Sequence, residues 1–146
     1  MFLINEDIRG VTMDENTNTY KTGISFSLKR ARVLIYHDTI RALGDPVCFR
    51  FLINKIDKKI AMQVCEFGED GYHIVPNYSG KESKFSYEIT SIELLRMIWN
   101  MCGWDENVTY HVIGTLYQKE KIVEFDLKQA EIISDAEFEA GGGEST

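Results

Sequence analysis

Two stretches of this 146-residue chain show the same succession of short elements, and this repetition most restricts the possible folds. In each stretch a helical pattern ends at a glycine, an aspartate follows, and two strand patterns flank a turn that contains lysine. The stretches read "IRALGDPVCFRFLINKIDKKIAMQV" and "WNMCGWDENVTYHVIGTLYQKEKIVEF". A unit of this size is too small to bury a core of its own, so the two units are expected to pack together.

The first unit is predicted to contain strands on both sides of one short helix. Apolar residues alternate with serines over 24–28, which predicts a half-buried strand, and the apolar run over 32–36 predicts a buried one. Asp38 or Thr39 is expected to cap the helix that follows, and Gly44 to end it in a left-handed conformation. Further strands are predicted over 47–54, 59–67 and 72–76.

The second unit repeats this order with a longer helix. A strand is predicted over 85–89 and a helix over 90–103, where Thr90 and Glu93 are spaced as a capping box. Strands over 107–117 and 121–127 and a helical turn within 128–140 complete the unit.

These patterns predict an α+β fold: a small β-rich barrel made of two βαββ units in one chain, an intrachain pseudo-dimer. Coincidence between two segments with similar turns is the alternative to a true repeat. We expect one shared-core domain, divided into a polar lead-in (1–20), a first unit (21–76), a linker (77–84), a second unit (85–135) and a flexible tail (136–146).

Composition and cysteine spacing bear on the cellular location of the chain. Hydrophobic residues make up 44% of the chain, enough for a core, but no apolar run approaches the roughly 18 residues of a membrane span. The N-terminus has too short an apolar stretch for a signal peptide. The three cysteines lack C-x-x-C spacing, which favours reduced thiols. We therefore expect a cytoplasmic protein without a membrane partner.

The charge distribution is uneven, although the formal net charge is −7. Residues 21–60 contain nine Lys or Arg and three Asp, whereas the rest of the chain contains seven basic and twenty acidic residues. Such polarity indicates a nucleic-acid face on an acidic body, contacts between the two halves, or solubility alone.

Residues capable of catalysis or metal binding do not form a recognisable constellation. His37 and Asp38 are better explained as a helix start than as metal ligands, because His73 and His111 do not have ligand spacing. The cysteines lie in apolar stretches, where this residue usually acts as a small buried hydrophobe. We expect no enzyme activity, no cofactor and no metal.

The segment "ARVLIYHDTIRALGDPVCFRFLINKIDKKIAMQV" resembles the AbrB/MazE/SpoVT group of swapped-hairpin β-barrels. Arg32 and Ile35 match the arginine and isoleucine of the family motif, and Leu43, Gly44 and Asp45 match its helix stop. The two-unit chain is similar to the tandem MraZ-type arrangement. Ala31 and Tyr36 stand where the family has glycine and proline, and the second unit lacks the arginine.

The resemblance implies a non-enzymatic bacterial regulator that binds double-stranded DNA, and Arg32 is the one binding residue that carries over. Lys29, Arg30 and Arg41 are added on electrostatic grounds, because basic side chains neutralise phosphates. Two alternatives stay open. The same residues can be the charged guard of a strand edge, and the chain can be a protein-interaction module, of a mobile element for example, whose acidic C-terminal half meets a basic protein. A homodimer is compatible with each.

Overall fold

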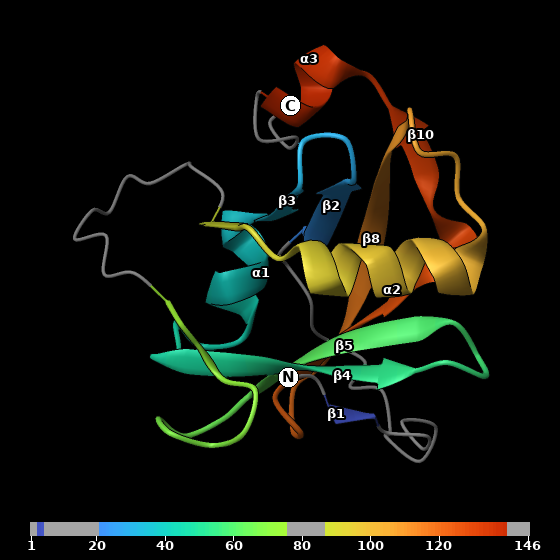
Figure 1. The fold of residues 1–146 in the computed structure, drawn as a ribbon. Helices are drawn as coiled ribbons and strands as arrows, with labels where there is room; N and C mark the ends of the chain where they lie inside the picture. Colours follow the sequence, from blue (N-terminus) through green and yellow to red (C-terminus); the bar gives the residue numbers. More distant parts are fainter. Residues whose placement is uncertain (1–2, 5–20, 76–86, 140–146) are drawn as a thin grey trace.

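The structure, a computed structural model, describes residues 3–4, 21–75 and 87–139. The predicted linker, and most of the predicted lead-in and tail, lie outside these residues. The described part is a small, strand-rich α+β fold in which a mainly antiparallel sheet curls into a half-barrel (Figure 1). Its elements are β1 (Leu3–Ile4), β2 (Gly23–Ser27), β3 (Arg32–Ile35), α1 (His37–Ala42), β4 (Cys48–Asn54), β5 (Lys59–Val64), β6 (His73–Ile74), β7 (Tyr87–Ile89), α2 (Ile92–Cys102), β8 (Thr109–Tyr117), β9 (Ile122–Asp126), η1 (Leu127–Gln129), β10 (Glu131–Ile133) and α3 (Asp135–Glu139).

Groups of strands from the first and the second half of the chain alternate across the sheet. The order is β1-β4-β5-β9-β8-β2-β3-β7, with β6 added to β4 and β10 added to β8. Only the β1–β4 pair among these described strands is parallel. Because β5 pairs with β9, β2 with β8 and β3 with β7, neither half has a complete sheet without the other.

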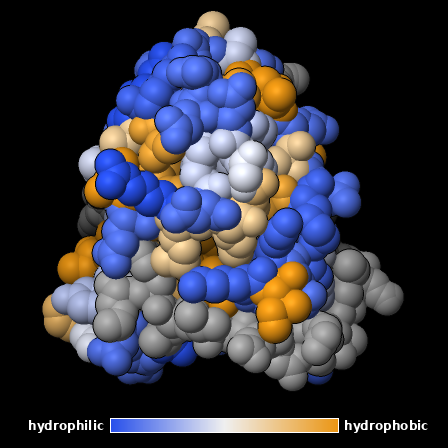
Figure 2. Space-filling view, turned by 45° about the vertical axis from the view of Figure 1, so that its right-hand side comes forward, coloured by the Kyte–Doolittle hydropathy of each residue, from blue (hydrophilic) through white to orange (hydrophobic). Residues whose placement is uncertain are grey.

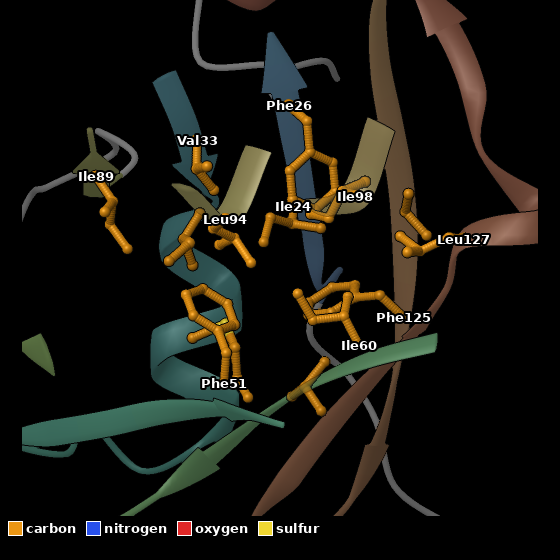
Figure 3. Close-up of a cluster of buried hydrophobic side chains, with 14 of the residues drawn as sticks. Ile24, Phe26, Val33, Phe51, Ile60, Ile89, Leu94, Ile98, Phe125 and Leu127 are labelled. Carbon is orange, nitrogen blue, oxygen red and sulfur yellow. The ribbon is translucent and has the colours of Figure 1, made fainter. Parts of the chain in front are cut away.

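The core lies inside the curl of the sheet, where α1 and α2 fill the space between its two ends (Figures 1 and 3). Period-two alternation places Ile24 and Phe26 of β2 in this core, and both are fully buried. The helix α2 buries an apolar stripe that includes Leu94 and Ile98, and Phe125 of β9 meets it from the sheet. The helix stripe and the strand alternation therefore face the same interior.

The helix ends differ in part from the sequence prediction. The N-cap of α2 is Ser91, whose hydroxyl accepts a hydrogen bond from Leu94 N–H at 3.3 Å, so the predicted Thr90 cap is wrong by one residue. Gly103 ends α2 with a φ of 66°, as predicted. The N-cap of α1 is Tyr36, whose side chain makes no capping hydrogen bond, so the predicted Asp38 or Thr39 cap is also wrong.

Thr39 has another role, because its hydroxyl both accepts from the N–H of Gly23 at 2.8 Å and donates to the carbonyl of Gly23 at 2.9 Å. This exchange fastens α1 to the first residue of β2. A tertiary contact thus takes the side chain that local sequence rules assign to a cap.

Most predicted strands are present with shorter bounds. β5 ends at Val64, and the strand predicted over 72–76 is reduced to the two residues of β6. The expected helical turn near the C-terminus is α3, and it is preceded by the strand β10, which the sequence analysis does not predict. The segment formed by β10 and α3 brings the C-terminal acidic residues back across the sheet.

Candidate functional site

Three of the predicted basic residues lie together at the turn between β2 and β3. In this turn Ala31 has a φ of 57°, and its N–H donates to the carbonyl of Leu28 at 3.0 Å. Ala31 is the residue that replaces the glycine of the family motif, and it adopts the left-handed conformation that glycine favours. Lys29, Arg30 and Arg32 flank it; we call these three residues the basic turn.

The helix α3 packs on the basic turn (Figure 1). Its start is fixed by a reciprocal capping box: Ser134 N–H donates to Glu137 Oε1 at 2.9 Å, and Glu137 N–H donates to Ser134 Oγ at 3.0 Å. Val33 and Ile35 face the core, so Arg32, which alternates with them, points to the outer face of the sheet. The helix therefore covers the face opposite the core.

Phe138 is the apolar anchor of this contact. Its side chain is 0% exposed, and its ring centroid lies 5.5 Å from Cζ of Arg30 and 5.4 Å from Cζ of Arg32. Cations over an aromatic face are attracted to its π electrons. A phenylalanine on a peripheral five-residue helix is thus as completely buried as the residues of the core.

Carboxylates surround the same cations. Asp135 accepts from Arg30 Nη1 at 3.2 Å and from Lys29 Nζ at 3.4 Å. Glu139 lies 3.1 Å from Arg30 Nε and 3.5 Å from Arg32 Nη1. Arg32 forms two parallel hydrogen bonds with Glu88 of β7, at 2.7 and 3.3 Å. All three basic side chains are therefore paired with acids from the second half of the chain.

The pairing changes the ionisation of its members. Hydrogen bonding to Glu88 raises the pKa of Arg32, and hydrogen bonding to Arg30 lowers the pKa of Asp135. These pairs are partly exposed, so water screens much of their attraction. Burying a phenylalanine is worth about 1.5–3 kcal/mol. Burial of Phe138 is therefore expected to contribute more to the docking of α3 than any single one of its ion pairs.

Arg41 does not join this group. It is exposed in the last turn of α1, which follows the end of β3 opposite to the turn where Arg32 lies. The structure thus brings together Lys29, Arg30 and Arg32 and places Arg41 elsewhere. Figure 2 shows that the upper part of its view, at the height of α3 in Figure 1, is mainly hydrophilic.

A polar cluster lies on the outer face of β2 and β8, beside the start of α1. Ser25 Oγ is 2.9 Å from the hydroxyl of Tyr36 and 3.2 Å from Nδ1 of His111, and the two rings stack at 4.9 Å. Burial lowers the pKa of His111 and raises that of Tyr36. The negative charge of Glu137 favours a higher pKa for both groups. Glu137 of α3 thus lies close enough to this half-buried cluster to affect both groups.

Several basic residues of the first half of the chain form ion pairs with acidic residues of the second half. Besides the basic turn, Lys59 of β5 lies 3.8 Å from Glu124 of β9. Arg50 pairs within its own half, with Glu69 at 3.2 Å. Of the three interpretations of the charge asymmetry, contact between the two halves is the one that the described ion pairs fit.

Sequence reasoning missed α3 as the partner of the basic turn, although a local signal exists. "SDAE" at 134–137 has the S-x-x-E spacing of a capping box, and Phe138 follows it directly. The pattern predicts a helix start with a single large apolar residue. What the helix packs on depends on a contact more than 100 positions away along the chain.

Comparisons with known proteins do not assign the chain to a family: no protein-family model matches it, and no curated protein or solved structure shows significant similarity to it. No helix among the described residues is long and apolar enough to cross a membrane. Within the same residues, His, Cys, Asp and Glu side chains do not gather in groups of three or more that could hold a metal ion.

Proposed function

We propose that the chain is a non-enzymatic protein-interaction module whose basic turn binds an acidic helical segment that carries an aromatic residue. The observation that carries the proposal is Phe138, fully buried under Arg30 and Arg32 by a helix whose carboxylates pair with the same cations. A surface that holds one such segment of its own chain has the shape and charge to hold a similar segment of a partner.

The short length of α3 supports an exchangeable contact. The helix has five residues, and isolated helices of this length are not stable in water. Its attachment rests on one buried ring and on partly exposed ion pairs. A partner segment with the same pattern that already forms a helix before it binds would lose less conformational entropy on docking, which favours displacement of α3.

DNA binding through Lys29, Arg30, Arg32 and Arg41 is the other proposal. The two ligands compete for the same charges, because a phosphate would have to replace carboxylates that already pair with the basic turn. The separation of Arg41 from the turn and the overall charge of −7 also disfavour a polyanion. The acidic segment is therefore the better-supported partner.

The two-unit organisation, and with it the AbrB-like, MraZ-type resemblance, also stays a proposal. It is supported by the antiparallel pairing of corresponding strands, β3 with β7 and β5 with β9. The position of β2 between β3 and β8 has no counterpart beside β7 and weakens the symmetry.

The proposal is tested with a fluorescent peptide of residues 131–139 and the full-length Phe138→Ala variant. Removing the ring is expected to release the chain's own helix and to free Lys29 and Arg30, while Arg32 keeps its pair with Glu88. The variant is expected to bind the peptide at least about tenfold more tightly than the wild-type chain, a difference of about 1.4 kcal/mol. Fluorescence anisotropy measures this, and circular dichroism checks that the variant keeps its fold.

Two controls make the result decisive. Adding Arg30→Ala and Arg32→Ala to the variant should abolish peptide binding, and a peptide carrying Phe138→Ala should bind weakly to every protein. Random-sequence duplex DNA is titrated in parallel over a salt series. If the Phe138→Ala variant binds the duplex with a steep salt dependence and ignores the peptide, DNA binding replaces the present proposal.

A further inference from the structure

Cys48 and Cys65 lie directly opposite one another at the open end of the β4–β5 hairpin. The register pairs Phe49 with Val64, so the next pair outward is Cys48 and Cys65. The N–H of Cys65 donates to the carbonyl of Cys48 at 3.2 Å, which fixes the two backbones in hydrogen-bonded opposition. Both thiols are free.

The two side chains also share a face of the sheet. Phe49 and Phe51 of β4 and Met62 of β5 point into the core, so the cysteines, in alternate positions, point to the outer face. Cys48 is 1% exposed, whereas Cys65 is partly exposed and open to a reagent. One thiol can therefore meet a reagent from solution while the other lies beside it.

The spacing of such a pair is close to that of a disulfide. Hydrogen-bonded antiparallel partners have Cα atoms about 5.5 Å apart, inside the disulfide range. Their Cβ atoms lie about 4.5–5.5 Å apart, slightly more than the 3.5–4.5 Å that a disulfide requires. The bridge must therefore draw the strand ends together, and a strained disulfide is easily reduced.

We propose that Cys48 and Cys65 are a reversible thiol-oxidation site, which a small disulfide such as oxidised glutathione converts into an intrachain bridge between β4 and β5. The Cys65 thiolate attacks the glutathione disulfide, forming a mixed disulfide and releasing one glutathione. Cys48 then loses its proton and attacks Cys65 Sγ, releasing the second glutathione. Two protein thiols lose two electrons and two protons, and the reagent gains them as two thiols.

The surroundings of Cys65 set the speed of this reaction. Burial, together with the nearby carboxylate of Glu69, raises the pKa of the Cys65 thiol. The thiolate is the attacking species, so the reaction is expected to be slow at neutral pH and faster in mild alkali. Cys102, at the end of α2, has no cysteine opposite it among the described strand pairs and is the internal control.

The test incubates the full-length chain with oxidised glutathione at about pH 8, followed by alkylation and mass spectrometry of the peptides. We expect a Cys48–Cys65 crosslink, with Cys102 alkylated or glutathionylated. Excess reduced glutathione should return both thiols. Cys102→Ser should leave the crosslink intact, whereas Cys48→Ser should stop the reaction at a mixed disulfide on Cys65.

Either of two outcomes would overturn the proposal. One is a wild-type chain in which Cys65 stops at the mixed disulfide while Cys48 stays free. The other is a crosslink through Cys48 or Cys65 that joins two chains, identified by its doubled mass on a non-reducing gel. The amide NMR spectrum of the oxidised chain distinguishes a bridge formed in the folded chain from one formed in unfolded molecules. Unfolded molecules would lose the dispersed amide signals of the native chain.

Discussion

Ala31, which lies among the residues of the basic turn, has an unusual backbone conformation for a residue other than glycine. At a φ of 57° the Cβ atom comes too close to the following carbonyl oxygen, and glycine avoids this clash because it has no Cβ. Ala31→Gly should remove this strain, which exceeds the entropy cost of the extra glycine. We expect the free energy of unfolding to rise by about 0.5–1 kcal/mol, measured by urea denaturation.

Ala136, an exposed alanine in α3, provides the control for this substitution. Ala136→Gly places a glycine at a helical position and should not raise the free energy of unfolding. A decrease in stability for Ala31→Gly would contradict the assigned turn conformation.

Two half-buried histidines predict a pH dependence at the same scale. Burial lowers the pKa of His111 and of His73 below 6.5, so the folded chain holds both rings neutral where the unfolded chain protonates them. The unfolded state then binds more protons, and the free energy of unfolding falls as the pH drops from about 6.5.

The size of this effect follows from the pKa displacement, about 1.4 kcal/mol for each unit. Urea denaturation between pH 7 and 5 should show a smaller loss of stability for His111→Gln than for the wild-type chain. An unchanged slope in both His111→Gln and His73→Gln would assign the pH dependence to other groups.

Element-scale behaviour is clearest at the start of α2, where two candidate caps are adjacent. The Ser91 hydroxyl accepts the N–H of Leu94, whereas Thr90 is exposed and lies outside the helix. Ser91→Ala should lower the free energy of unfolding by about 1 kcal/mol, and Thr90→Ala should change it by less than about 0.5 kcal/mol. Thermal unfolding of both variants decides between the two positions.

At the scale of the whole molecule, the alternation of strands from the two halves predicts that neither half folds alone. A fragment of residues 1–84 would retain β2 and β5 but lose their partners β8 and β9. Its circular dichroism should be that of an unfolded chain, and the full chain should unfold in one transition. A folded, dispersed amide spectrum from the fragment would show that the first half forms a domain of its own.

The sequence by itself determines the local elements. Alternating apolar residues place most strands, the stripe at 3.6-residue spacing places α2, and Gly103 ends it, because these signals are carried by neighbouring residues. It also reveals the three basic residues of the turn, as an excess of charge on one half.

Only the tertiary structure decides what those elements meet. Thr39 fastens α1 to Gly23, and Phe138 brings acids onto Arg30 and Arg32. The physical reason is that pairing across a curled sheet joins residues far apart in the chain, where no short pattern records the contact. The same cations predict a DNA face when they are considered alone and a protein-binding face once their carboxylate partners are in place.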